Sequence, residues 1–345
     1  MPLRPIYNPP NPWSSTESEW LEAPPPARLE VFEELAKSIV STNDSPDIGF
    51  RHSINAYRGC THACAYCYAR PTHQYLGYGA GTDFETKIVV KTNAVALLRE
   101  AFMRKSWDGE TIVFSGNTDC YQALEASYKL TRGLLQTCAE FHNPISMITK
   151  SALVRRDADV LAELAKHARA QVSISIAFTD EAMARKMEHG APPPKARFEA
   201  MRALAKAGVP VSVGVAPIIP GLNEGQVPDI LKMAADAGAR NAFYTLLRLP
   251  AEVKDVFFHA LEERFPTHMK KVEHQIRLTR GGELNNSQFG KRFSGEGATW
   301  EIVRDLFEVT CSKLGLNKLD EEAGNYAAFK GVKTFQRPGE QLNLL

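Results

Sequence analysis

The chain has 345 residues, of which 44% are hydrophobic and 23% charged, and its formal net charge is +1. This composition is typical of a globular protein and excludes a disordered chain, while the charge excludes a general electrostatic attraction to nucleic acid. Six cysteines do not form a disulfide framework, and no apolar stretch is long enough to span a membrane. The Pro-rich N-terminus also lacks the apolar core of a signal peptide.

The first 45 residues are predicted to form an extended N-terminal arm, because they are Pro-rich at the start and show no hydrophobic periodicity there. From Ser53 onward, short β-branched runs alternate with amphipathic segments of helical length. The expected strands are 54–57, 111–115, 145–149, 172–177, 211–215 and 242–246. The expected helices are 93–105, 124–141, 158–167, 194–207, 226–237 and 252–265.

This alternation predicts an α/β fold with a parallel sheet and right-handed crossovers, over residues 46–266. By itself the pattern fits either a doubly wound open sheet or a barrel. Residues 267–345 are predicted to be a C-terminal extension, with a polar, Gly-rich loop followed by a helix near 302–314. Functional residues in both parallel folds lie at the carboxyl ends of the strands.

The motif with the most specific chemistry follows the first predicted strand. Cys60, Cys64 and Cys67 stand in a C-x3-C-x2-C pattern, with Tyr66 just before the third cysteine. A 4Fe-4S cluster normally takes four thiolates, so a loop with three leaves one iron open to another ligand. The alternative is a structural zinc site of the Cys3His type, completed by His52, His62 or His73. Structural zinc loops usually have two separated ligand pairs, which favours the cluster.

The cysteine pattern resembles the signature of the radical S-adenosylmethionine (SAM) superfamily. This resemblance implies an open (βα)6 partial TIM barrel, a 4Fe-4S cluster and SAM bound at the open iron. It also implies an enzyme that reductively cleaves SAM to a deoxyadenosyl radical, which abstracts hydrogen from a substrate. Such an enzyme needs a one-electron donor such as flavodoxin or ferredoxin. An oxygen-sensitive cluster also favours a reducing compartment, so a cytoplasmic location is expected.

Within the superfamily, the loop CTHACAYCYAR resembles the spore photoproduct lyase branch, often labelled DNA repair photolyases. The resemblance implies that Tyr66 contacts the SAM adenine and that Tyr68 relays a hydrogen atom. The remaining residues that it assigns to SAM binding lie at successive strand ends: Ser115, Asn117, Thr118, Asp119, Lys150, Ser175 and Val215. A lysine can pair with a carboxylate and an aspartate with an ammonium group, so these roles are chemically reasonable.

The sequence departs from that branch at the hydrogen-donating cysteine, whose position is occupied by Gly116. Cys120 lies four residues further along and is the alternative donor. The favoured activity is a carbon–carbon lyase acting on a DNA lesion or nucleobase, and the alternative is radical modification of a peptide or small metabolite. A non-catalytic iron–sulfur or zinc module is the third class. Nucleic acid would bind a local basic rim, predicted from Lys270, Lys271, Arg277, Lys291 and Arg292.

Overall fold

The structure is a computed structural model, and it describes residues 4–14, 23–318 and 331–339. Its main sheet has seven strands in the order β10-β9-β8-β7-β6-β3-β2. These strands are β2 (Val40–Thr42), β3 (His52–Ile54), β6 (Ile112–Phe114), β7 (Ile145–Thr149), β8 (Ala170–Ser175), β9 (Val211–Ile218) and β10 (Asn241–Leu246). All neighbours pair in parallel except β2, which pairs antiparallel with β3.

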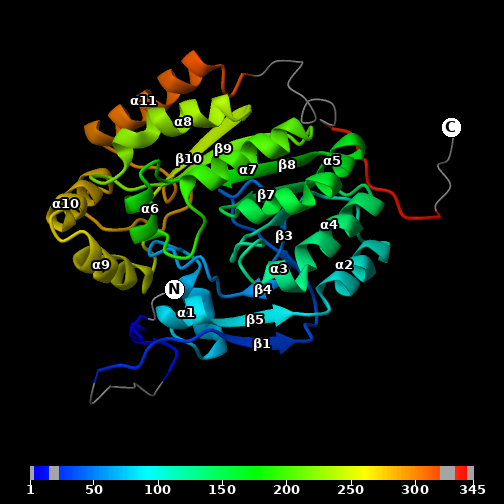
Figure 1. The fold of residues 1–345 in the computed structure, drawn as a ribbon, viewed down its shortest axis with the longest axis horizontal. Coiled ribbons are helices and arrows are strands. Elements are labelled where there is room, and N and C mark those ends of the chain that lie inside the picture. Colours follow the sequence, from blue (N-terminus) through cyan, green and yellow to red (C-terminus); the bar gives the residue numbers. More distant parts are fainter. Residues whose placement is uncertain (1–3, 15–22, 319–330, 340–345) are drawn as a thin grey trace.

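The main sheet is an open, partial barrel, because β10 and β2 form its two ends and do not pair with each other. Helices connect consecutive parallel strands and cover its outer face (Figure 1). They are α2 (Ala94–Met103), α3 (Glu125–Tyr128), α4 (Leu130–Glu140), α5 (Ala158–His167), α6 (Glu181–Met187), α7 (Pro194–Lys206) and α8 (Val227–Asp236). The predicted α/β fold with six alternating strands is therefore confirmed.

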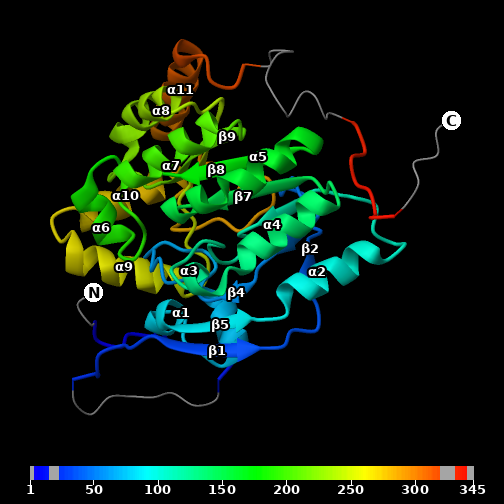
Figure 2. The same ribbon diagram turned by 45° about the vertical axis from the view of Figure 1, so that its right-hand side comes forward.

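A second, three-stranded sheet lies beside the barrel, in the order β1-β5-β4. It comprises β1 (Glu30–Glu34), β4 (Tyr57–Arg58) and β5 (Lys87–Lys91), with the short helix α1 (Thr82–Thr86) leading into β5. Figure 2 shows this layer below the helices of the barrel. The first 45 residues therefore differ from the expected extended arm, because β1 and β2 are hydrogen-bonded into the two sheets.

In the described residues, three helices follow the last strand: α9 (Val253–Arg264), α10 (Met269–Thr279) and α11 (Ala298–Leu314). The sequence pattern predicted α9 and most of α11, but not α10. Helices α7 and α8 are each followed by a glycine, Gly208 and Gly238, with φ of 84° and 96°. This left-handed conformation favours glycine and ends a helix before the next strand.

Buried hydrophobic side chains form two main clusters. The larger one fills the space between the barrel strands and helices α2, α4, α5, α7 and α8. The second cluster joins Cys64 and Tyr66 of the cysteine loop to residues of α6, α9 and α10. The cysteine loop is therefore held by packing as well as by hydrogen bonds.

Candidate active site

The cysteine loop begins with a turn that only a small residue can make easily. Gly59 has φ of 75°, and a Cβ there would lie 2.9 Å from the carbonyl oxygen of Phe84. The same carbonyl accepts a hydrogen bond of 2.8 Å from the amide of Cys60. The Gly59 carbonyl in turn accepts a bond of 2.6 Å from the Thr118 hydroxyl. The loop is thus fixed to the segment that follows β6, which contains several predicted site residues.

Arg70 holds the middle of the loop from a fully buried position. Its guanidinium donates two hydrogen bonds, of 3.1 and 2.8 Å, to the carbonyl of Cys64. It also donates to the carbonyls of Ala80 and Gly81, and forms an ion pair of 2.5 Å with Glu85. Because a buried guanidinium needs all of its donors satisfied, this set of bonds makes the loop conformation specific.

Cys60 and Cys64 are buried, Cys67 is half-buried, and none of the three forms a disulfide. Burial, together with the charges of Asp119 and Cys67, raises the pKa of the Cys60 thiol to about 12. Burial also raises the pKa of Cys64, whereas the nearby Lys150 opposes that shift. Thiols held neutral in this way lose their protons when a metal binds them. Three thiols from one loop, two of them buried, beside a cation, are a donor set that fits an iron–sulfur cluster.

The zinc alternative gains no support from this geometry. Within the described part of the chain, no three His, Cys, Asp or Glu side chains are arranged to hold one metal ion. A cubane cluster binds each thiolate through a different iron, so its cysteine ligands do not need to meet at one point.

Asp119 lies between the cysteine loop and the end of β7. Its oxygens accept hydrogen bonds from the Tyr121 amide, the Thr149 hydroxyl and the Lys150 amide, at 2.9, 2.7 and 2.7 Å. The His62 ring nitrogen lies 3.3 Å away. Although burial opposes the charge, His62 and these hydrogen bonds hold the pKa of Asp119 well below its usual value. A carboxylate has about four acceptor positions, and donors of the protein occupy three of them; the role of Asp119 in SAM binding stays a prediction.

Lys150 belongs to a buried polar network with Tyr66. Its ammonium lies 5.6 Å from the centre of the Tyr66 ring, and the Tyr66 hydroxyl donates to Glu188. Glu188 also forms an ion pair with Arg197, and both side chains are fully buried. Burial opposes the charge on Lys150, but Cys64 and Glu188 raise its pKa above the usual value. Lys150 is thus a protonated cation next to the thiols.

Ser175 joins the same network through its backbone. Its carbonyl accepts a bond of 3.1 Å from Arg197, and its hydroxyl donates to the Ala216 carbonyl at 3.1 Å. The structure therefore brings Tyr66, Lys150 and Ser175 together around one ion pair. Val215 is nearby in β9, but its side chain is buried within the larger hydrophobic cluster.

Two predicted site residues, Ser115 and Asn117, lie directly after β6. Ser115 has φ of 74°, and its hydroxyl accepts a bond of 2.9 Å from the Cys120 amide. Asn117 is exposed, and its amide donates to the side chain of Asn55 at 2.9 Å. Ser115 and Asn117 therefore form a tight turn at the strand end, and the Asn117 side chain is open to solvent.

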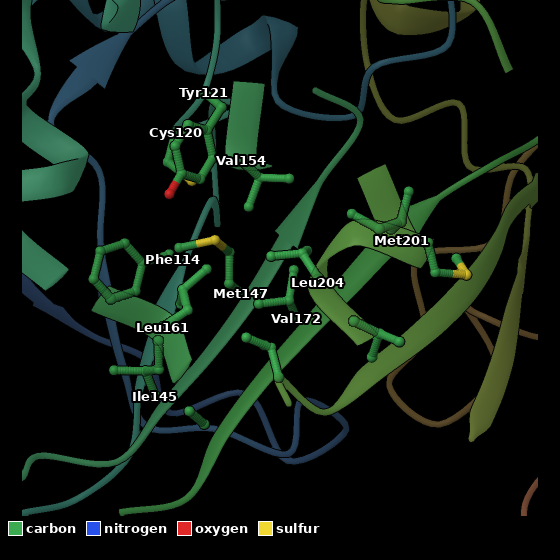
Figure 3. Close-up of a cluster of buried hydrophobic side chains, with 14 of the residues drawn as sticks. Phe114, Cys120, Tyr121, Ile145, Met147, Val154, Leu161, Val172, Met201 and Leu204 are labelled. Carbon is green, nitrogen blue, oxygen red and sulfur yellow. The ribbon is translucent and has the colours of Figure 1, made fainter. Parts of the chain in front are cut away.

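The Cys120 side chain points into the hydrophobic core (Figure 3). It is 4% exposed and lies in the same cluster as Phe114, Tyr121 and Met147. Burial, followed by the charge of Asp119, raises its pKa well above the usual value. The Cys120 side chain thus packs in the core as a small hydrophobic group, although its amide bonds to the Ser115 hydroxyl.

Tyr68 is the predicted catalytic residue that remains accessible, with 50% of its surface exposed. Its hydroxyl donates a hydrogen bond of 2.5 Å to the carbonyl of Gly116. On the other side, the guanidinium of Arg248 lies 5.9 Å from the centre of the Tyr68 ring. The phenol thus lies beside the glycine that replaces the donor cysteine of the resembling branch.

The predicted basic rim is only partly available. Lys270 and Lys271 are exposed on α10, and Lys291 is exposed on the following loop. Arg277 forms an ion pair with Glu273, and Arg292 forms one with Asp47. The rim is therefore less positive than the sequence indicates.

Sequence reasoning missed four side chains that shape this site: Arg70, Glu188, Arg197 and Arg248. Glu188 and Arg197 are nine positions apart, on either side of the segment HGAPPPKA, which follows α6 and whose last three residues begin α7. A charged pair that flanks a Pro-rich break between two helices is the signal that could have found them. Separately, no helix among the described residues is long and apolar enough to cross a membrane.

Comparison with known proteins places these residues in a family context. Residues 54–234 match the family model described as the radical SAM superfamily. An uncharacterized protein of Mycobacterium tuberculosis is 38% identical over 241 residues, which cover 69% of this chain and 71% of that protein. An uncharacterized protein of Methanocaldococcus jannaschii is 26% identical over 254 residues, which cover 74% of this chain and 91% of that protein.

The fold is similar to that of a solved structure, spore photoproduct lyase complexed with dinucleoside spore photoproduct. The TM-score is 0.59 and the sequence identity 16%, and the match covers 83% of this chain and 80% of that chain. A variant of the same lyase with bound AdoMet gives the same TM-score. At this level of identity the similarity describes the arrangement of the chain and not its substrate.

Proposed function

The chain belongs to the radical SAM superfamily, and from this premise we propose that it is a lyase acting on a nucleic-acid lesion or modified nucleobase. The family uses a 4Fe-4S cluster and SAM, together with an external electron donor, for which we propose flavodoxin or ferredoxin. When bound, the cluster and SAM supply a one-electron reduction and a carbon radical that can abstract a hydrogen atom.

The residues of the cysteine loop have separate parts in this proposal. Cys60, Cys64 and Cys67 hold the cluster, since their buried thiols come from one loop fixed by Arg70. Lys150 pairs with the SAM carboxylate, because it is a cation that lies beside both Cys64 and the Tyr66 ring. Tyr66 offers its ring to the adenine, and the bond between its hydroxyl and Glu188 fixes the ring orientation.

The observation that carries the lyase proposal is the position of Tyr68. Its phenol is half-exposed, follows the third cysteine directly and is held at the Gly116 carbonyl by a bond of 2.5 Å. A phenol in this position can pass a hydrogen atom between the cofactor side and a substrate at the open end of the barrel. Arg248 on the far side of the ring places a cation next to the same point, which suits a substrate with a phosphate group.

Cleavage of a carbon–carbon bond after hydrogen abstraction leaves a radical that needs one hydrogen atom back. Tyr68 is accessible, whereas Cys120 is enclosed in the core. We therefore assign the return of the hydrogen atom to Tyr68. The phenoxyl radical left behind would be reduced by one electron from the external donor and protonated by water, which can reach the half-exposed phenol.

The test uses anaerobically reconstituted protein, a chemical reductant and SAM, with and without ultraviolet-irradiated DNA. We expect slow deoxyadenosine formation alone, faster formation with irradiated DNA, and a repaired nucleobase product that Tyr68→Phe no longer yields. Lys150→Ala should weaken SAM binding by about 1.5–3 kcal/mol through loss of a charge-assisted bond, whereas Lys166→Ala, at an exposed position, should not.

No stimulation by any irradiated or modified DNA would contradict the nucleic-acid substrate. Stimulation by a peptide or small metabolite instead would establish the alternative chemistry on the same cofactors. An unchanged SAM affinity in Lys150→Ala would show that the SAM carboxylate lies elsewhere.

A further inference from the structure

Five side chains form an alternating row of rings and guanidinium groups that starts at the cysteine loop. We call this row the aromatic–cation ladder; its members in order are Tyr68, Arg248, Phe293, Arg292 and Phe289. The guanidinium of Arg248 lies 5.9 Å from the Tyr68 ring and 4.8 Å from the Phe293 ring. That of Arg292 lies 5.0 Å from the Phe293 ring and 4.9 Å from the Phe289 ring.

The backbone under the ladder is fixed by three independent contacts. The Leu246 amide at the end of β10 donates to the Phe293 carbonyl at 3.0 Å. Buried Arg280 donates to the carbonyls of Ser294 and Leu247, at 2.8 and 2.7 Å. Asp47 accepts a bond of 2.8 Å from the Arg292 guanidinium and one of 3.0 Å from the Gly290 amide. The ladder is therefore ordered before any ligand arrives, which lowers the entropic cost of binding.

The two guanidinium groups of the ladder differ in their charge balance. Arg292 is neutralised by Asp47, and only 13% of its side chain is exposed. Arg248 forms no ion pair with any residue that the structure describes, and its Nε atom is buried without a hydrogen-bond partner. The position beside Tyr68 is thus where the ladder offers an unused positive charge and an unused donor.

The ring at the outer end of the ladder is open to solvent. Phe289 is 59% exposed, so a ligand can reach its ring. Exposed rings alternating with guanidinium groups are the surface on which nucleobases stack while their phosphates are held.

We propose that the ladder binds the single strand that flanks the reacting base, with a phosphodiester at Arg248 and a neighbouring base stacked on Phe289. This inference rests on the proposed function and names the part of the nucleic acid that the site recognises.

The experiment measures the binding of a fluorescently labelled oligothymidylate of about eight nucleotides, a length suited to a single binding groove. Phe289→Ala should weaken binding about five- to 150-fold, the range for loss of one base–ring stack, and Phe289→Trp should restore it. Arg248→Ala should weaken binding and reduce the slope of log affinity against log salt by about 0.7, the value for one phosphate contact on a single strand.

Lys105→Ala is the matched control, because it removes one exposed positive charge from the far end of the strands, just before β6. It should change neither the affinity nor the salt slope beyond the error of the wild-type protein. Circular dichroism of each variant shows whether it is folded. If Arg248→Ala does not fold, Arg248→Lys, which retains the positive charge, takes its place in the test. Arg248→Lys should bind with intermediate affinity, since it keeps the charge and loses the planar donor.

Two results would overturn the proposed role of the ladder. One is that Phe289→Ala and Arg248→Ala both bind the oligonucleotide with wild-type affinity; the other is that these two variants lose no more affinity than Lys105→Ala does. If lesion-dependent deoxyadenosine formation is nevertheless observed, the proposed function stands and the strand is bound elsewhere. If Phe289→Ala and Arg248→Ala lose oligonucleotide binding but the wild-type protein processes no lesion, the strand-binding role of the ladder is supported and the lyase activity is refuted. Absence of oligonucleotide binding by the wild-type protein overturns the ladder, and deoxyadenosine formation with irradiated DNA then decides the proposed function separately.

Discussion

Replacing Glu188 with alanine tests whether its ion pair holds the site together. The Glu188 and Arg197 side chains are 0% and 1% exposed, so the substitution leaves a guanidinium charge out of contact with water. Breaking a buried pair by removing one partner costs about 3–5 kcal/mol. The Tyr66 hydroxyl loses its acceptor in the same step, but this loss is part of one coupled network and is not added separately.

The assay is urea unfolding of the metal-free protein, followed by circular dichroism. For a slope near 3 kcal/mol per molar urea, the midpoint of Glu188→Ala should fall by roughly 1–2 M. Glu188→Gln should lose less, because the amide still accepts a hydrogen bond from Tyr66. Glu273→Ala, which breaks the exposed pair with Arg277, is the control and should cost about 0–1 kcal/mol.

The double variant Glu188→Ala/Arg197→Met tests whether the loss of stability in Glu188→Ala comes from the unpaired charge of Arg197. Since it removes the unpaired charge as well as the pair, it should be more stable than Glu188→Ala alone. If the double variant is less stable by the sum of the two single losses, the residues act independently. An unchanged midpoint in Glu188→Ala would show that the ion pair contributes nothing to the fold.

Three further predictions follow from the same contacts. Alanine at Cys60, Cys64 or Cys67 should abolish the brown absorption and the bound iron of anaerobically purified protein, whereas Cys138→Ala should retain both; stoichiometric zinc in the wild type would contradict the cluster. Burial lowers the pKa of His73 to about 4, so as the pH falls the unfolded chain takes up a proton at His73 before the folded protein does. The free energy of unfolding should therefore decrease by about 3 kcal/mol between pH 6.5 and pH 4. In His73→Phe the urea midpoint should change less over this pH range, and a pH profile identical to that of the wild type would refute the prediction. Gly81→Ala should release the N-terminal segment, because a Cβ would lie 1.9 Å from the Tyr7 carbonyl oxygen, and limited proteolysis should then cut before residue 14 faster than in the wild type.

The barrel was predictable because each of its parts has a local signal. The run at 145–149 is the strand β7 as predicted, and 158–167 is the helix α5. Gly208 and Gly238 mark helix ends through a conformation that other residues rarely adopt. The strands β1 and β2 were not predictable, since each is short and its partner, β5 or β3, lies at least ten residues away in the sequence.

The candidate site was predictable where the chemistry depends on a few adjacent residues, as in the cysteine loop. It was not predictable where a side chain finds its partner through the fold. The three hydrogen bonds that Asp119 accepts from Tyr121, Thr149 and Lys150 could not be read from the sequence, because two of these partners lie on the next strand end. Cys120 follows Asp119 directly, yet the turn at Ser115 directs its thiol into the core.

The open side of the barrel limits which substitutions and deletions this protein can accept during evolution. The outer edge of β10 is not bare, because Asn317 exchanges two hydrogen bonds with Ala242, of 2.8 and 2.9 Å, and Phe293 bonds to Leu246. Unpaired strand edges invite association with other chains. The backbone of the segment around Phe293 therefore covers the edge of β10, while the side chains of this segment form part of the aromatic–cation ladder. Side chains here are free to diverge between relatives and alter what is recognised, whereas a deletion would expose the strand and favour aggregation.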